Sequence, residues 1–407
     1  MNSLATRHGI PYFVIFSTGH GLSSLGSWMQ KTAVGWLTWE LTHSPAWVGA
    51  IAMSDLIAAL WVAPFAGAVT DRSNPFRLML LTQTLLIVLT LILWAMTASG
   101  VVTIWLLLAW AITDASVQGF NQPVRMLVIG SLAPPERMSQ AIATNSIAVN
   151  LARSLGPAIA GVVMVTGHIE QVFLINAFSF IALVTVIVWV RRHINRPGLS
   201  PRTVHILHDI HSGFSYIRHT PVIATLFALA LGFALLARPF SELFPAIAGD
   251  ILRGGPQTLS WLMSAQGFGA LLGAVWMLKA KPADHLIKIT FGSAVGIAAT
   301  LMIFSFATQL EWVVFIIAIA GIFHVVCNIG MQTMAQTLSE PAMKGRVMAL
   351  YGLIFRAGPA LGAFIFGACA QWVNLQWLLG AAAAVFGVMV LVKLPQIRRV
   401  YFTEILM

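Results

Sequence analysis

Six ionisable side chains lie within long apolar stretches of the sequence, and they could carry the chemistry of ion or substrate movement. They are Asp55, Asp114, Arg153, Arg238, Glu242 and Arg356. Charged groups in hydrocarbon are costly, so they usually face a cavity and serve a function. A desolvated carboxyl group can bind and release protons, and arginines in excess can hold an organic anion. We therefore predict that the six line a path for a substrate or for protons.

A structural interpretation competes with this one at each carboxylate. Asp55 and Asp114 can each form a fixed pair with a neighbouring arginine instead of exchanging protons, and the sequence leaves both interpretations open. Arg238 and Glu242 stand one helical turn apart on one face, which allows a local ion pair. We predict that this pair lies on the transport path.

Histidines offer a second kind of chemistry. His20 and His324 are central in their apolar stretches, where a lone buried histidine is more often a hydrogen-bonded packing residue than a functional one. His205, His208 and His211 invite a metal interpretation, but their spacing spreads them over about 120° of a helix. We favour a polar helix face and expect no metal site.

These residues need elements to position them, and the composition shows which kind. The chain is 58% hydrophobic and 9% charged, whereas soluble proteins carry about 25% charged residues, so a soluble protein is excluded. Roughly 20 apolar residues span the hydrocarbon layer as a helix. Twelve spans fit: 11–40, 45–70, 76–98, 102–130, 139–166, 170–190, 221–248, 257–279, 285–308, 311–337, 343–370 and 374–393. The predicted fold class is all-α integral membrane, with twelve transmembrane helices.

The net charge of +10 is spread over alternate loops. With a cytoplasmic N-terminus, 18 of the 23 Lys and Arg residues lie inside, Arg125 being counted among them, and of the rest only Arg253 lies outside. The positive-inside rule then places both termini in the cytoplasm, with the chain in the inner membrane. Nucleic-acid binding is disfavoured, because no single basic face gathers the charge.

Two short motifs recur at about half the chain length. Gly67-Ala68-Val69 returns as Gly273-Ala274-Val275, and Gly156-Pro157 returns as Gly358-Pro359. Transporters are often built from two six-helix halves, so one duplication explains both recurrences. We predict pseudo-symmetric six-helix bundles at 1–190 and 221–393, a cytoplasmic linker with an amphipathic helix at 191–220, and a cytoplasmic tail at 394–407.

A candidate gate follows the second predicted span. Gly67, Asp71 and Arg72, followed by Arg77, stand in a cytoplasmic turn, where an acidic and a basic residue can pair and separate as a gate opens. The spacing resembles the GxxxDR signature of the major facilitator superfamily, although the residues at 73–76 differ from the glycine and basic residues usual there. The resemblance implies a gating motif, and the alternative is a basic loop that only sets topology.

The paired glycine and proline motifs resemble one found in proton-linked drug antiporters. In a helix, proline frees a backbone carbonyl and small residues permit close approach. For Gly156, Pro157, Gly358 and Pro359, simple packing and a role in coupling both stay open. A second motif of that family, RxxQG, is half present, because Ala115 replaces its arginine.

Further stretches resemble the siderophore-exporter branch, typified by the enterobactin exporter. They include Gly26 to Gln30, Gln122 to Arg125, Arg238-Pro239 and Leu243 to Ala248. The resemblance implies the major-facilitator fold and export of a small organic molecule, siderophore-like or drug-like, with protons as the coupling ion. We expect a monomer in the lipid bilayer.

Two other classes of function compete with transport. An enzyme would need a nucleophile with its base or a metal cluster, and the HExxH, GxSxG and phosphate-loop motifs do not occur. We therefore expect no enzyme, no cofactor and no direct use of ATP. A receptor or scaffold on the same fold, which binds without transporting, stays open as the alternative.

Overall fold

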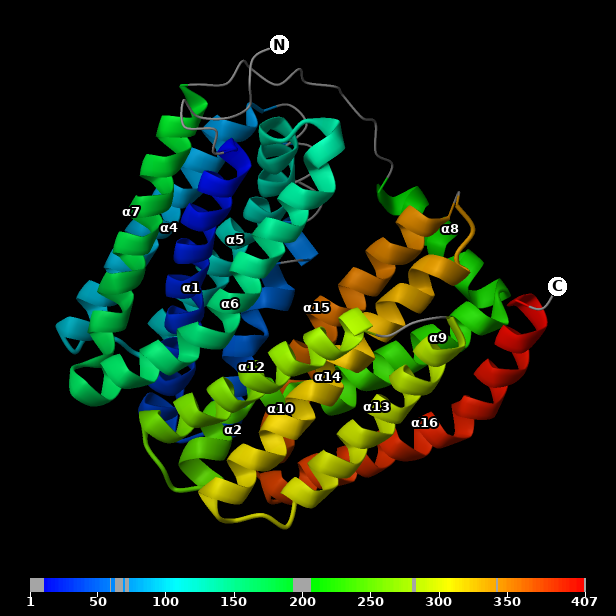
Figure 1. Ribbon diagram of the computed structural model, residues 1–407. Coiled ribbons are helices and arrows are strands. Elements are labelled where there is room, and N and C mark those ends of the chain that lie inside the picture. The colour runs from blue at the N-terminus through cyan, green and yellow to red at the C-terminus, as the bar shows by residue number, and fades with distance from the viewer. Residues whose placement is uncertain are drawn as a thin grey trace. The chain divides into compact units, whose positions relative to one another are not determined.

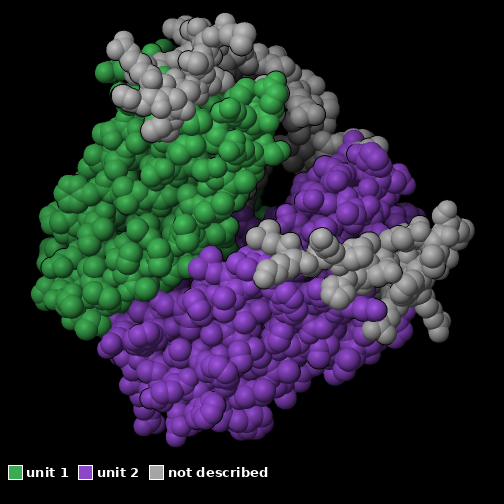
Figure 2. All heavy atoms as spheres, in the orientation of Figure 1, with its two compact units in different colours: residues 1–41, 57–204 green, residues 42–56, 205–407 purple. Residues whose placement is uncertain are grey.

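The computed structural model describes residues 11–58, 60–62, 69, 73–192, 206–279, 283–341 and 343–405. Within these ranges the chain forms helices joined by turns and short loops (Figure 1). It divides into two compact units (Figure 2): unit 1 is residues 1–41 and 57–204, and unit 2 is residues 42–56 and 205–407. Gly67, Asp71 and Arg72 of the predicted gate lie outside the described residues.

Unit 1 contains five long helices in its described part. They are α1 (Tyr12–Thr42), α4 (Pro75–Ala98), α5 (Ile104–Leu132), α6 (Met138–Thr166) and α7 (Ile169–Arg191), with the short helix η1 (Pro135–Arg137) before α6. At 1.5 Å per residue, each is long enough to cross about 30 Å of hydrocarbon. Asn74 begins α4, because its side-chain oxygen accepts hydrogen bonds from the backbone N–H groups of Phe76 and Arg77 at 3.0 and 3.2 Å.

Unit 2 holds the remaining described helices. They are α2 (Pro45–Ala52), α8 (Ile206–His219), α9 (Pro221–Gly232), η2 (Phe233–Ala237), α10 (Pro239–Glu242), α11 (Phe244–Ala246), η3 (Ile247–Ile251), α12 (Pro256–Lys279), α13 (Ala283–Phe304), α14 (Leu310–Leu338), α15 (Lys344–Cys369) and α16 (Leu375–Ile405). The helix α8 falls in the segment where the sequence predicts an amphipathic helix. Of the three linker histidines, His205 and the side chains of His208 and His211 lie outside what the structure describes.

Ten helices of the described residues are long and apolar enough to cross a membrane. Helices α1 and α5 are equally long but fall outside this group because they are more polar. Their polar residues are His20, Ser23, Ser24, Ser27 and Gln30 on α1, and Asp114, Gln118, Asn121 and Arg125 on α5. The all-α membrane fold predicted from the sequence is confirmed, and polarity gathers on two helices of unit 1.

The span expected at 221–248 is not one regular helix. It is interrupted at η2 and η3, which are π-helical turns, and by the short helices α10 and α11. The backbone N–H of Arg238 donates to the carbonyl of Phe233 at 3.0 Å, five residues back. Pro239 follows directly and has no N–H, so a regular ladder cannot continue through it. The irregular backbone lies among buried residues, where such geometry is tolerated in membranes.

Helix α2 packs within unit 2, against α15, although it comes early in the chain. Two glycines bring the backbones together: a Cβ at Gly49 would lie 2.5 Å from the Ala363 carbonyl oxygen, and one at Gly367 would lie 2.3 Å from that of Pro45. Helix α2 ends at Ala52, and only Met53, whose backbone is also in the α region, separates it from the helical residues 54–58. Residues 45–62 are long and apolar enough to cross a membrane, within the span expected at 45–70, and residues 42–56 belong to unit 2.

Candidate functional site

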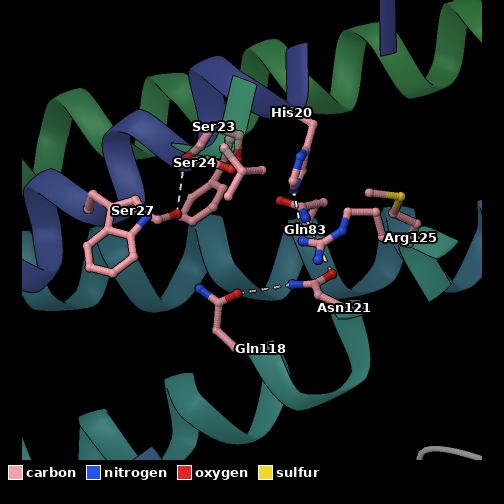
Figure 3. Close-up of a pocket in the computed structure, with 12 residues that line it drawn as sticks. His20, Ser23, Ser24, Ser27, Gln83, Gln118, Asn121 and Arg125 are labelled. Atoms are coloured by element: carbon pink, nitrogen blue, oxygen red, sulfur yellow. Dashed lines mark hydrogen bonds between the residues drawn. The ribbon is translucent and has the colours of Figure 1, made fainter. Parts of the chain in front are cut away.

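A polar cavity of about 180 Å³ lies inside unit 1 (Figure 3). Its polar lining residues come from three helices: His20, Ser23, Ser24 and Ser27 from α1, Gln83 from α4, and Gln118, Asn121 and Arg125 from α5. Trp28, Met79, Val149 and Phe180 complete the wall. Protein interiors at membrane depth are mainly apolar, so a cluster of this kind marks a candidate functional site.

Two of the lining residues, His20 and Arg125, contact each other. Nη1 of Arg125 lies 3.1 Å from Nε2 of His20, and the His20 side chain is only 7% exposed. An arginine side chain has donors and no acceptor. Nε2 of His20 therefore accepts, which makes the imidazole neutral with its proton on Nδ1. Phe16, one turn earlier on α1, stacks on this ring with centroids 6.1 Å apart and holds its plane.

Asn121 connects the other polar side chains of the cavity. Its Oδ1 accepts from the Thr82 hydroxyl at 2.8 Å and from Nε2 of Gln83 at 3.4 Å. Its Nδ2 donates to Oε1 of Gln118 at 3.4 Å. The NH₂ group of Gln118 takes no part in this chain of bonds. Helices α4 and α5 are joined by these contacts, which fix the cavity wall opposite α1 (Figure 3).

Three buried polar atoms of the lining residues lack a hydrogen-bond partner among the described residues. They are Nδ1 of His20, Nε of Arg125 and Oε1 of Gln83. Buried polar groups are nearly always paired, and each exception requires an explanation. Two of the three, Nδ1 of His20 and Nε of Arg125, are donors on adjoining side chains, and both atoms are covered by protein, with the side chain of Asn145 facing His20.

A second buried network holds α1 in place next to the cavity. Oε1 of Gln30 accepts from Nδ2 of Asn176 at 2.9 Å and from the Thr90 hydroxyl at 3.2 Å, and Asn176 accepts from the Ser179 hydroxyl at 2.9 Å. Gly26 makes room for this network, because a Cβ there would lie 2.3 Å from the Asn176 and Ser179 oxygens. Because these side chains bind one another, we assign them the role of positioning α1.

The predicted residues of unit 1 that the structure describes are not among the residues that line the cavity. Arg153 is exposed, and its guanidinium lies 5.0 Å from the ring centre of Trp28. Asp114 is half-buried on α5 and is not a lining residue. Gly156 packs against α1, where a Cβ would meet that of Trp28 at 2.6 Å, and Pro157 is buried inside α6. Arg77 is exposed in the first turn of α4.

In unit 2, Arg238 contacts the helix that carries the second glycine and proline motif. Its Nη1 donates to the carbonyl of Phe355 at 3.2 Å, and its guanidinium lies 5.5 Å from the centre of that ring. Phe355 is four residues before Pro359, which has no N–H, so its carbonyl lacks the usual helical donor. Arg238 supplies a substitute hydrogen-bond donor to this carbonyl.

The other predicted residues of unit 2 are spread around this contact. A Cβ at Gly358 would lie 2.6 Å from that of Ala234 in η2. Arg356 is exposed, and Asp55 and Glu242 are half-buried. The ion pair between Arg238 and Glu242 stays a prediction. His324 packs against Phe233 with ring centres 4.9 Å apart.

Sequence reasoning missed the cavity. It counted Arg125 among loop cations, which is wrong, because Arg125 lies within α5 and binds a buried histidine. It also took His20 for a packing residue. A signal was available: Gln118, Asn121 and Arg125 follow the i, i+3, i+7 spacing of one helical face, and the polar residues of α1 from His20 to Ser27 follow the same spacing. A polar stripe on an apolar helix points inward.

Comparison with known proteins places these features in a family. A family model described as transmembrane secretion effector matches residues 8–402. The staphyloferrin A transporter of Staphylococcus aureus is 21% identical over 88% of this chain and 89% of its own. The enterobactin exporter EntS of Escherichia coli is 27% identical over 66% of this chain and 64% of its own. An uncharacterized MFS-type transporter of Bacillus subtilis, YfiS, is 25% identical over 94% of both chains.

Solved structures agree on the fold. A peptide transporter, POT, solved in complex with sulfate, has a TM-score of 0.75 at 14% identity and covers 97% of this chain and 96% of its own. A bacterial homolog of the human lysosomal transporter Spinster has a TM-score of 0.67 at 14% identity, with 95% of both chains covered. At this identity the likeness concerns the fold alone.

Proposed function

The chain belongs to the transmembrane secretion effector family of the major facilitator superfamily, and from this premise we propose that it exports a small organic molecule of siderophore-like or drug-like kind. It is a multi-pass membrane transporter and not an enzyme. Two of the relatives are a siderophore exporter and a siderophore transporter by name. Their names support the substrate class and the outward direction.

The observation that carries the proposal is the polar cavity of unit 1. Its residues lie on helices that are otherwise apolar and long enough to span a membrane. A polar cavity lined by hydrogen-bond donors is the kind of site in which a transporter holds part of its substrate. A scaffold needs no such cavity, whereas a receptor would also need one, so the names of the relatives support transport over a receptor.

In the proposed mechanism the two six-helix halves at 1–190 and 221–393 alternate in exposing the site to each side of the membrane. Protons moving inward drive the export, and Gly67, Asp71, Arg72 and Arg77 act in the cytoplasmic gate. Both termini and the 191–220 linker are cytoplasmic, and the chain works as a monomer in the inner membrane. The charge distribution of the loops supports this orientation. Asp55, Asp114, Arg153, Arg238, Glu242 and Arg356 remain candidates for the path of substrate or protons.

The test is flux of enterobactin and staphyloferrin A in proteoliposomes that hold the purified chain. With an imposed pH gradient, we expect time-dependent movement of at least one of them, absent from protein-free vesicles and slowed by a protonophore. Binding without flux would contradict export and favour a receptor. Flux that ignores the protonophore would leave transport intact and remove proton coupling.

A further inference from the structure

The cavity of unit 1 is cationic and rich in donors. Arg125 and His20 are the ionisable side chains among the described lining residues, and no described lining residue is acidic. The imidazole is neutral in the observed contact, so the guanidinium supplies a full positive charge that no side chain of the described lining balances. A buried charge without a counter-charge is costly, and an anion entering the cavity offsets that cost.

The donors converge from both sides of the cavity. Arg125 and the Gln118 amide come from α5, and the hydroxyls of Ser23 and Ser24 come from α1, beside His20 (Figure 3). Arg125 lies in the cavity wall, and its Nη1 is held by Nε2 of His20. Guanidinium groups bind planar oxyanions such as carboxylates through two parallel hydrogen bonds. A lining with a guanidinium, hydroxyls and amides, and with no acidic side chain among its described residues, therefore matches an oxyanion better than a cation or an amine.

The size of the cavity limits what can enter. The cavity of about 180 Å³ is smaller than pockets for whole drug-sized ligands, which measure roughly 300–1,000 Å³. The cavity therefore fits one acidic group with its ring or short chain. Trp28, Met79 and Phe180 supply an apolar wall for that ring.

His20 acts on the arginine and not on the ligand. Its Nε2 accepts from Nη1 of Arg125, which fixes the guanidinium, while Asn145 of α6 faces the ring from another helix. A protonated imidazole could not accept this bond. His20 is therefore a positioning residue, and any side chain with an acceptor at this place can partly replace it.

We propose that this cavity is the subsite for an oxyanion group, a carboxylate or an equivalent acidic oxygen, of the exported molecule, with Arg125 as its binding residue and His20 as the residue that orients Arg125. The proposal rests on the proposed function, because it names the chemical class of the substrate that is exported. It also assigns anion binding to Arg125, one of the 23 Lys and Arg residues of this chain.

The test is calorimetric titration of the purified full-length chain in detergent with benzoate, and with benzamide as its neutral counterpart. We expect benzoate to bind and benzamide to bind at least about tenfold more weakly, since a charge-assisted hydrogen bond contributes ~1.5–3 kcal/mol. Arg125→Gln should lose about tenfold or more in benzoate affinity, and Arg125→Lys should lose less. The control is Arg191→Gln, which removes an exposed charge of the same unit and should bind benzoate as the unchanged chain does.

The role of His20 needs a separate pair of variants. His20→Gln keeps an acceptor and should retain most of the benzoate affinity, whereas His20→Phe should lose it to nearly the same extent as Arg125→Gln. Equal affinities of these two variants would overturn the positioning role. Wild-type affinity in Arg125→Gln, equal binding of benzoate and benzamide, or no benzoate binding up to its solubility would overturn the subsite. If enterobactin or staphyloferrin A is still transported in any of those cases, the proposed function stands and only this inference is wrong.

Discussion

Arg125 of unit 1 and Arg238 of unit 2 are both arginines within membrane-spanning stretches, yet their surroundings differ. Arg125 meets a neutral histidine beside a cavity, and its Nε has no partner among the described residues. Arg238 donates to the carbonyl that Pro359 leaves unpaired and lies over the ring of Phe355. An arginine inside a membrane-spanning stretch can therefore bind a ligand or donate to a backbone carbonyl that a proline leaves unpaired. Its neighbours determine which of the two roles it has.

The backbones around the two arginines differ in the same way. Arg125 lies on α5, which is helical from Ile104 to Leu132. Arg238 lies between η2 and α10, where the helix is broken, and Gly358 and Gly362 of α15 pack closely against this stretch. We therefore expect the close packing around Arg238 to contribute to the stability of unit 2. We expect the cavity beside Arg125 to contribute to function.

The largest effect should come from filling the tight interface. Gly358→Leu places side-chain atoms where a Cβ alone would be 2.6 Å from that of Ala234, so we expect strong destabilisation, about 1–3 kcal/mol or more. The measurement is thermal unfolding in detergent together with the yield of monodisperse protein. Gly352→Leu on the same helix is the control, because a Cβ there meets nothing within 4 Å. A similar loss of stability in both variants would mean that leucine destabilises α15 at either position. It would then give no evidence that the interface at Gly358 is tightly packed.

Removing Arg238 should have the next largest effect. Arg238→Met keeps the length of the side chain but leaves the Phe355 carbonyl without its donor, which costs about 1–3 kcal/mol for a buried group. Arg356→Met, at an exposed position of α15, should change the unfolding midpoint much less. An unchanged unfolding midpoint for Arg238→Met would contradict the difference drawn between the two arginines, because Arg238 would then not stabilise the fold either.

A double-mutant cycle sharpens the assignment of Arg238. Pro359→Ala restores the N–H that a regular helix donates to the Phe355 carbonyl. In that background, Arg238→Met should cost less than it does alone, by roughly 0.5–1.5 kcal/mol, the net contribution of one hydrogen bond. Additive effects on the unfolding midpoint would mean that Arg238 stabilises unit 2 through some other contact.

The smallest change in stability should come from Arg125. Arg125→Met has two opposing effects: it leaves Nε2 of the buried His20 without its donor, which costs stability, and it removes a buried charge that no described lining side chain balances, which favours stability. We expect a change in unfolding free energy within about 0.5 kcal/mol and, under the proposed function, strongly reduced flux. A destabilisation as large as that of Arg238→Met would mean that both arginines hold the fold together.

The sequence by itself determined the membrane class and the helical fold, because both follow from local properties. Runs of about 20 apolar residues and the scarcity of charge leave a chain few alternatives. The break in the helix at Pro239 also has a local cause, since the missing N–H is a property of that one residue. The family resemblance followed from short motifs whose spacing is also local.

Only the tertiary structure decided which polar residues meet. His20 and Arg125 are 105 residues apart, and nothing in either helix specifies the other, so one was taken for a packing residue and the other for a loop cation. The same holds for Arg238 and Phe355, which are 117 residues apart and whose contact depends on a carbonyl freed by a proline elsewhere. Polarity of a helix can be read from its sequence, but the partner of a buried group is set by packing between helices, which the order of residues along the chain does not encode in any local pattern.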